Sequence, residues 1–113
     1  MFHIIESQDW AQAQESNEYV PARYESEGFI HLSGRHQVLH PANLFYQGRE
    51  NLLLLEIDAE SLTSDLIYEP GSNGETQLFP HLYGPLNLDA VRVVHDFPCE
   101  VDGAFSLPAT LAG

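Results

Sequence analysis

The pattern of apolar and polar positions predicts short elements of both kinds rather than one long helix or strand. Residues 2–5 are apolar and predict a strand. The next segment has the apolar spacing of a helix that buries Trp10 and Ala13. Ser7 is the expected N-cap of this helix, which should end near Asn17.

The middle of the chain is harder to assign. Residues 19–27 are mostly polar and include a proline, which predicts an irregular loop, and residues 28–32 that follow are typical of a strand. Ser33 then stands where it would cap a helix that runs to about Tyr46. Pro41 lies inside that helix, which is therefore expected to break or restart just before it.

The second half of the chain is rich in strand patterns. The apolar run at 52–58 predicts a strand that is covered on both faces and lies at the centre of a sheet. One helical turn, a short strand, a turn and two further strands are expected at 59–63, 66–69, 70–74, 77–83 and 90–95. Helices in the first half and strands in the second favour an α+β fold.

Length and composition indicate one domain that spans residues 1–113. A chain of 113 residues with 43% apolar side chains can form a single ordinary core. The first ten residues lack the positive charge and long apolar region of a leader, and nowhere do 18 apolar residues follow one another. We therefore expect a cytoplasmic protein with no membrane partner.

The charge balance narrows the classes of ligand. The chain has 17 acidic and four basic residues, a formal net charge of −13, and all four basic residues are arginines. Such a surface disfavours extended contact with nucleic acid or with an anionic membrane. A small anionic ligand stays compatible, because one arginine or one helix start can hold a pyrophosphate. Cys99, the single cysteine, has no histidine beside it and is expected to be inert.

Six histidines are the most informative feature of the composition. His3, His31 and His81 fall in predicted strands with apolar neighbours, where a buried imidazole without a partner would cost about 1–3 kcal/mol. Each one either bonds a nearby carbonyl or shares a common cleft with the others. His95 is expected to be a strand residue without a further role.

The two remaining histidines, His36 and His40, raise the question of a metal site. The i, i+4 spacing of His36 and His40 would place both on one helical face and supply half of a zinc site. Pro41 weakens that premise, and the chain has no HExxH pattern. A solvated helix face is the favoured interpretation, and we expect no metal.

Two motifs stand out as candidate binding segments. In residues 27–33, Gly28 permits a tight turn, and Ser33 at a helix start would favour an anionic or amide group or would act only as a cap, which Gln37 would complete. Residues 79–84 combine two aromatic rings with His81, which suits either a base or nicotinamide ring or a corner of the core. Tyr83 is one of these rings, and Glu69 is the nearest carboxylate in sequence. No G-x-S-x-G turn, Walker loop or G-x-G-x-x-G motif is present.

These segments resemble one family across nearly the whole chain, the domain of unknown function 952 family. The residues that carry the resemblance are FHI at 2–4, Trp10 with Ala13, Tyr19, EGFIHLS at 27–33, Gln37, Ala42-Asn43, LLEID at 54–58, Tyr68-Glu69 and FPHLYGPLNLDAV at 79–91. EGFIH and FPHLYG at this separation are the most specific of them.

The resemblance implies an ADP-ribosyltransferase-like fold, similar to that of the RNA 2′-phosphotransferases, in which two small antiparallel sheets flank a cleft for NAD. It implies that His3 holds the ribose on the nicotinamide side and that His31 with Ser33 flanks the nicotinamide. His81 falls where the superfamily often has a glutamate, a change that reduces electrostatic support for the transition state. Asn17 stands where the family usually has glycine, and the arginines of the phosphotransferases are not evident.

We therefore expect a domain that binds NAD, ADP-ribose or an ADP-ribosylated small molecule, and that acts as a transferase or glycohydrolase if it is an enzyme. The expected catalytic residues are His3, His81 and Glu69, and the expected ligand-binding residues are His31, Ser33, Gln37 and Tyr83. Two other interpretations stay open. One is a non-catalytic module that binds a nucleotide or a protein, and the other is a metal-dependent hydrolase that uses the same histidines.

Overall fold

The computed structural model describes residues 1–71 and 76–111, which form two three-stranded antiparallel sheets, one strand pair and short helices. The first sheet has the order β1-β4-β8, and the second sheet has the order β3-β6-β5. The strands are β1 (Phe2–Glu6), β4 (Leu52–Ile57), β8 (Val91–Asp96), β3 (Ile30–His31), β6 (Leu78–Tyr83), β5 (Asp65–Pro70) and the paired β2 (Glu18–Tyr19) and β7 (Leu86–Asn87). The helices are α1 (Ser7–Ser16), α2 (Tyr24–Glu27), α3 (Leu39–Phe45) and the 3₁₀ turns η1 (Ala59–Ser61) and η2 (Leu88–Ala90).

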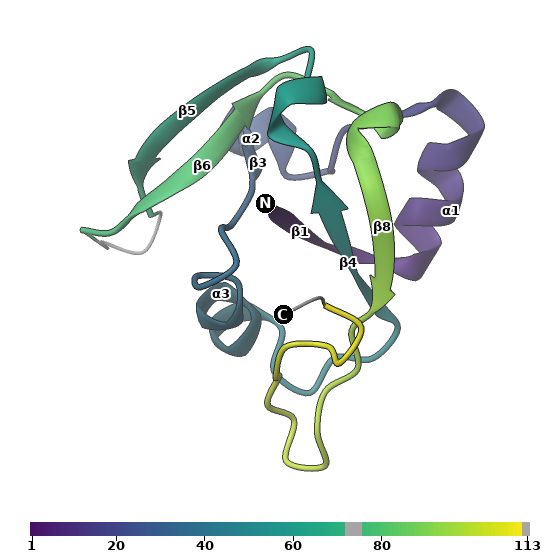
Figure 1. Ribbon diagram of the computed structural model, residues 1–113, viewed down its shortest axis with the longest axis vertical. Helices are drawn as coiled ribbons and strands as arrows, with labels where there is room; N and C mark the ends of the chain where they lie inside the picture. Colours follow the sequence, from purple (N-terminus) through teal and green to yellow (C-terminus); the bar gives the residue numbers. More distant parts are fainter. Residues whose placement is uncertain (72–75, 112–113) are drawn as a thin grey trace.

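The first sheet separates two apolar cores. Side chains alternate across the sheet, so Leu55 and Ile57 of β4 face one core and Leu52 and Leu54 face the other. α1 contributes Ala13 to the core that also includes residues of the second sheet. α3 and the segment after β8 cover the opposite face. The two helices accordingly lie on opposite sides of the first sheet (Figure 1).

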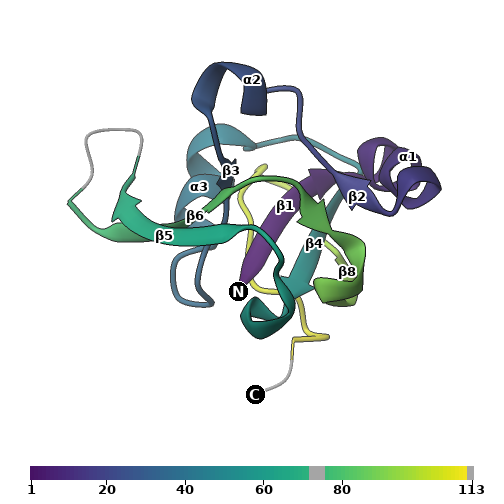
Figure 2. The ribbon, with the colours of Figure 1, turned by 90° about the horizontal axis from the view of Figure 1, so that it is seen from above.

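The second sheet consists mainly of the β5–β6 hairpin, which extends away from the rest of the molecule (Figure 1 and Figure 2). Its register pairs His31 of β3 with His81 of β6. Because directly paired residues point to the same face, these two imidazoles stand side by side. The neighbouring pair, Ile30 and Leu82, points the other way and is fully buried in the core. The register thus fixes which face of the second sheet carries the histidines.

The fold class is confirmed as α+β. The apolar run at 52–57 is the central strand of its sheet, as its pattern predicted. The strands expected at 2–5, 66–69, 77–83 and 90–95 are present with shifts of one or two residues at their ends. α1 covers the predicted helix, although its N-cap position is occupied by Glu6 rather than Ser7.

Two expectations for the middle of the chain were wrong. Residues 19–27 are not wholly irregular, because Tyr19 pairs in β2 and α2 forms at 24–27. Ser33 is not a helix N-cap, because its backbone N–H and carbonyl both bond to Phe2 across an isolated bridge. α3 therefore begins only at Leu39, and Pro41 lies in its first turn, where a missing N–H costs nothing.

Of the turn expected at 70–74, Gly71 donates its N–H to the carbonyl of Gln77, and residues 72–74 lie outside the described residues. No helix in the described part of the chain is long and apolar enough to cross a membrane.

The end of α1 gives a first testable prediction. Asn17 adopts a left-handed conformation with φ of 62°, and asparagine tolerates this conformation better than other residues with a Cβ atom. Asn17→Ala is expected to destabilise the protein by about 1 kcal/mol, and Asn17→Gly is expected to be neutral or slightly stabilising. Urea unfolding of the three proteins measures this order. Equal stability of the alanine variant and the parent would contradict it.

Candidate functional site

A cavity lies where the two three-stranded sheets meet and then separate. β1 is an edge strand of the first sheet and β3 is an edge strand of the second. Phe2 and Ser33 join these edges through two backbone hydrogen bonds of 2.7 and 2.8 Å. In a continued antiparallel ladder, the next bonded pair would be Ile4 and His31. The strands diverge instead, and the cavity occupies the gap.

The side chain of His3 takes the place of that missing backbone pair. Its Nδ1 lies 2.7 Å from the carbonyl oxygen of His31, which a continued ladder would offer to the N–H of Ile4. A carbonyl oxygen can only accept, so Nδ1 carries the proton and donates it. The imidazole is therefore held in one orientation and one tautomer at the point where the sheets separate.

Burial keeps His3 neutral. Desolvation lowers the pKa of His3 from 6.5 to about 4, although the hydrogen bond to the His31 carbonyl opposes this effect. With Nδ1 protonated, Nε2 carries a lone pair and acts only as an acceptor. This Nε2 atom is buried and has no hydrogen-bond partner in the protein. His3 thus presents one unused acceptor beside the cavity.

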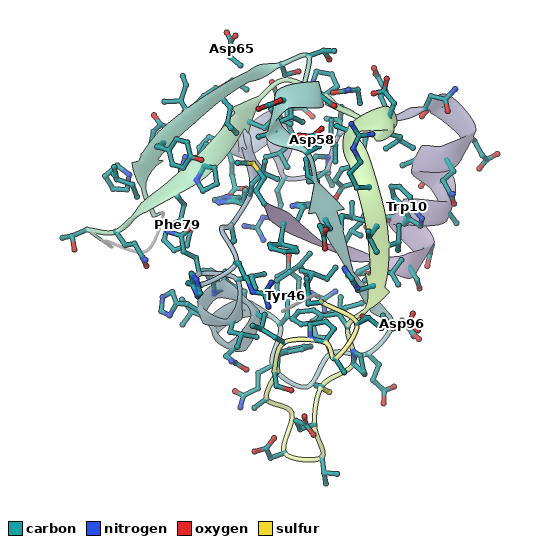
Figure 3. All side chains as sticks on the ribbon, in the orientation of Figure 1. Trp10, Tyr46, Asp58, Asp65, Phe79 and Asp96 are labelled. Atoms are coloured by element: carbon teal, nitrogen blue, oxygen red, sulfur yellow. The ribbon has the colours of Figure 1, made fainter. Side chains whose placement is uncertain are left out.

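The cavity has a volume of about 250 Å³ and an aromatic lining. Its buried part includes His3, Tyr19 and Ser33, and its more exposed side includes Arg23 and Arg49. Tyr46, which follows α3, lies between that helix and the first sheet (Figure 3). The other lining residues are Phe2, Ile4, Ile5, Glu6, Asp9, Pro21, Ala22, Glu27, Phe29, His31, Pro41 and Phe45.

His31 lines the same cavity from the second sheet. Its Nε2 lies 3.1 Å from Glu27 Oε1, but the two groups are not aligned as a hydrogen bond, and this nitrogen too is buried without a bonded partner. Burial lowers the pKa of His31, while the carboxylate of Glu27 acts in the opposite direction. His3 and His31 therefore meet at one cavity.

His81 stands next to His31 but does not line the cavity. The two rings are 5.4 Å apart, and Phe29 stacks on His81 at 4.0 Å with an angle of 15° between the planes. Phe29 itself lines the cavity, so its ring lies between the cavity and His81. The three imidazoles are neighbours, but an aromatic side chain covers the third.

Glu69 and Tyr83 form a hydrogen-bonded group with His81. Glu69 Oε1 lies 2.9 Å from His81 Nδ1 and accepts from the Tyr83 hydroxyl at 2.5 Å. The Tyr83 and His81 bonds hold the pKa of Glu69 below its usual value, and the same carboxylate raises the pKa of Tyr83. An ionised Glu69 only accepts, so Nδ1 of His81 carries the proton. His81 Nε2 is then an acceptor, and it is buried without a partner.

The two remaining candidates have different surroundings. Ser33 is buried and lines the cavity at the bridge between the sheets. Gln37 lies outside the lining, and both ends of its amide hold the backbone: Oε1 accepts from Gly34 N–H at 2.9 Å, and Nε2 donates to the Leu78 carbonyl at 2.6 Å. Gln37 thus ties the loop before α3 to β6.

Comparison with known proteins agrees with this architecture. Residues 4–94 match the family described as protein of unknown function (DUF952). The chain belongs to the DUF952 family. It is also similar to the X-ray structure of protein CC0527 from Caulobacter crescentus, with 33% identity, a TM-score of 0.83 and coverage of 93% of this chain and 91% of that one.

The solution NMR structure of CC0527 gives the same result, with 34% identity, a TM-score of 0.77 and coverage of 91% of this chain and 88% of that one. The X-ray structure of a double mutant of CC0527 matches this chain with a TM-score of 0.83 and 32% identity. No curated protein matches the chain. The comparisons therefore place the chain in the DUF952 family and name no activity for it.

The other histidines of this DUF952 chain lie outside the cavity lining. The idea that His36 and His40 share a helical face was wrong, because His36 lies in the turn before α3 and only His40 lies in the helix. Among the described residues no group of three His, Cys, Asp or Glu side chains is arranged to hold a metal ion. His95 does more than pair in β8: its ring bonds Glu56 at 3.0 Å and Thr110 at 2.7 Å.

Several residues of the cavity were not predicted from the sequence. Phe29 lies inside the 27–33 motif but was not singled out, although it touches three aromatic rings of this region. Tyr46, Arg23 and Arg49 come from loops without a recognisable motif. The scarcity of basic residues was a usable signal for the arginines, because two of only four line one cavity.

Proposed function

We propose that the cavity binds NAD or ADP-ribose, and that the chain is an ADP-ribosyltransferase-like domain of the DUF952 family. The observation that supports this most directly is the set of three buried Nε2 atoms, on His3, His31 and His81, that have no hydrogen-bond partner. Buried polar atoms are nearly always bonded, so this group of neighbouring nitrogens, of which only His31 Nε2 faces a charged partner, Glu27, favours a ligand site. The Nε2 atoms of His3 and His81, whose Nδ1 atoms carry the proton, would each accept a hydrogen bond from a donor on the ligand.

His3 suits a ribose hydroxyl. Its Nδ1 is held by the His31 carbonyl, and its Nε2 can only accept, which a hydroxyl donor satisfies. The pKa of His3 near 4 means that this acceptor persists throughout the neutral range. The single protonation state makes His3 a binding and orienting group rather than a proton donor.

The volume and lining of the cavity favour the nicotinamide–ribose half of NAD. A cavity of about 250 Å³ falls just below the roughly 300–1,000 Å³ range of pockets that enclose drug-sized ligands. It would therefore enclose one ring and its sugar, with the rest of the dinucleotide at the opening. Phe29, His31 and Tyr46 supply flat surfaces against which a pyridine ring can stack.

As a glycohydrolase, the domain would break the bond between the nicotinamide nitrogen and the anomeric carbon. The bonding electron pair leaves with nicotinamide, and positive charge develops on the ribose. A water molecule then forms the new bond to the anomeric carbon and gives up a proton, which His81 Nε2 can accept. Glu69 would stabilise the resulting imidazolium, and Tyr83 would keep Glu69 in place. Phe29 has to turn away from His81 for this step.

The stacked position of Phe29 also favours a second candidate, a module that binds the nucleotide without catalysing a reaction. With the ring of Phe29 on His81, only His3 and His31 reach the cavity. A site in that arrangement has an acceptor for the ligand on His3 but no base at the anomeric carbon. Release of nicotinamide from NAD distinguishes the enzyme from the module.

Calorimetric titration with NAD, ADP-ribose and nicotinamide tests the proposed site. His31→Ala is expected to weaken binding more than His81→Ala, because only His31 lines the cavity, and the matched control His36→Ala changes an exposed histidine outside it. Binding of none of the three compounds, or binding that survives both substitutions, would refute the proposal. Nicotinamide release by the parent, lost in His81→Ala, would identify the catalytic form.

A further inference from the structure

We infer that Arg23 and Arg49 form a phosphate subsite at the opening of the cavity, so that the ligand is a phosphorylated nucleoside with its phosphate at the rim. The inference rests on the proposed function and adds which end of the ligand lies where. Both side chains line the cavity although the chain has only four basic residues. They are about half exposed, whereas His3 and Ser33 are buried, which separates a charged rim from a buried interior.

The two arginines approach the opening from different elements. Arg23 comes directly before α2, and Arg49 follows α3 and precedes β4. Two guanidinium groups at one cavity suit a phosphate or pyrophosphate, because arginine donates paired hydrogen bonds to phosphate oxygens. A single arginine elsewhere on the surface would not create this arrangement.

Each guanidinium is already held in place and still has donors to give. Arg23 uses Nε and Nη2 on the two carboxylate oxygens of Glu27, both at 3.2 Å. Arg49 bonds Glu6 through Nη2, and its guanidinium lies 5.3 Å from the centre of the Tyr46 ring. Because a guanidinium has five N–H donors, both arginines keep hydrogen-bonding capacity for a ligand. Their carboxylate partners restrain them and reduce the ordering cost of binding.

The local charge at the cavity is also more favourable to an anion than the average of this acidic chain. The lining combines the two arginines with three carboxylates, Glu6, Asp9 and Glu27, so it is close to neutral while the whole chain carries −13. Arg92 does not line the cavity and bonds Asp58 and Ser61. An anion that approaches this opening meets less repulsion than the average surface would impose.

The test compares nicotinamide riboside with nicotinamide mononucleotide, which differ only in one phosphate. Calorimetry on the full chain at low salt is expected to show the mononucleotide binding at least about tenfold more tightly. Arg49→Gln should remove most of this difference, because the mononucleotide loses more affinity than the riboside does. Glu6→Gln should preserve or increase the difference in affinity, because Arg49 then loses its competing carboxylate. Arg92→Gln is the matched control and should leave the difference unchanged.

The outcomes separate the subsite from the proposed function. Equal affinity for riboside and mononucleotide would overturn the phosphate subsite and leave the nucleoside cavity intact. If neither compound binds, the proposed function fails, and inorganic pyrophosphate then decides the subsite. Pyrophosphate binding that Arg49→Gln abolishes and Arg92→Gln preserves would support it. No pyrophosphate binding, or equal binding to both variants, would overturn it.

Discussion

Replacing Phe97 with alanine is expected to lower the free energy of unfolding by about 3–5 kcal/mol. Phe97 is 1% exposed and lies in the core between the first sheet, α3 and the carboxyl-terminal segment, where it stacks on Phe105 at 4.8 Å. Its truncation removes apolar contact area and leaves a cavity that the surrounding strands cannot close. Urea denaturation monitored by circular dichroism measures the loss.

Val101→Ala is the matched control, because Val101 is fully exposed in the same segment and its truncation should change stability by less than about 0.5 kcal/mol. The effect of Phe97→Ala should also reach the cavity. Phe105 accepts and donates hydrogen bonds with the side chain of Asn43 in α3, and Pro41 and Phe45 of that helix line the cavity. A Phe97→Ala protein as stable as Val101→Ala would show that the segment after β8 is not part of the core.

Local patterns were sufficient to predict most strands. The run Leu52 to Ile57 is almost continuously apolar, and only a central strand with cores on both faces buries such a run. α1 was predictable because its apolar positions recur at helical spacing and Asn17 supplies a residue that tolerates the left-handed conformation at its end. These signals lie within a few neighbouring residues.

The middle of the chain was misassigned because tertiary contacts override local preference there. Ser33 has the residue type of a helix cap, but its backbone groups pair with Phe2, 31 positions earlier in the chain. No pattern within residues 28–46 reveals that partner. The delayed start of α3 and the turn that contains His36 both follow from this bridge.

The candidate site could be predicted only in part, because local motifs identify residues but do not show which tertiary contacts they make. The motifs identified His3, His31 and Ser33, which line the cavity, and His81 with Glu69 and Tyr83, which form a neighbouring group. The position of Phe29 between the cavity and His81 depends on the register of β3 against β6 and on the turn at Gly28. Register between strands 50 residues apart leaves no local signal, so this covering ring could not be predicted.

The break between the two sheets and the chemistry of the site meet at His3. A backbone pair between Ile4 and His31 would continue the ladder and close the gap, but the imidazole of His3 occupies the carbonyl that this pair requires. The same bond fixes the tautomer of His3 and leaves Nε2 as an acceptor. The residue at the point where the sheets separate is therefore also a residue placed to orient a ligand.

This arrangement predicts that His3 makes the protein less stable in mild acid. The imidazole has a pKa of 6.5 when solvated and about 4 in the folded protein. Between these two pH values the unfolded chain is protonated at His3, whereas the folded protein is not. Stability contributed by neutral His3 is complete above pH 7 and is lost as the pH falls below 6.5. Between pH 7.5 and pH 5.0, this loss is about 2 kcal/mol.

Urea unfolding of the parent and of His3→Phe at these two pH values measures the contribution. The phenylalanine variant should lose about 2 kcal/mol less than the parent on acidification, while His36→Gln, a change at an exposed histidine, should follow the parent. The same imidazole can be followed in the unmodified protein by NMR, which should find His3 still neutral at pH 5. A His3 that takes up its proton near pH 6.5 would contradict both the buried acceptor and its role in holding a ribose hydroxyl, because a protonated Nε2 could only donate.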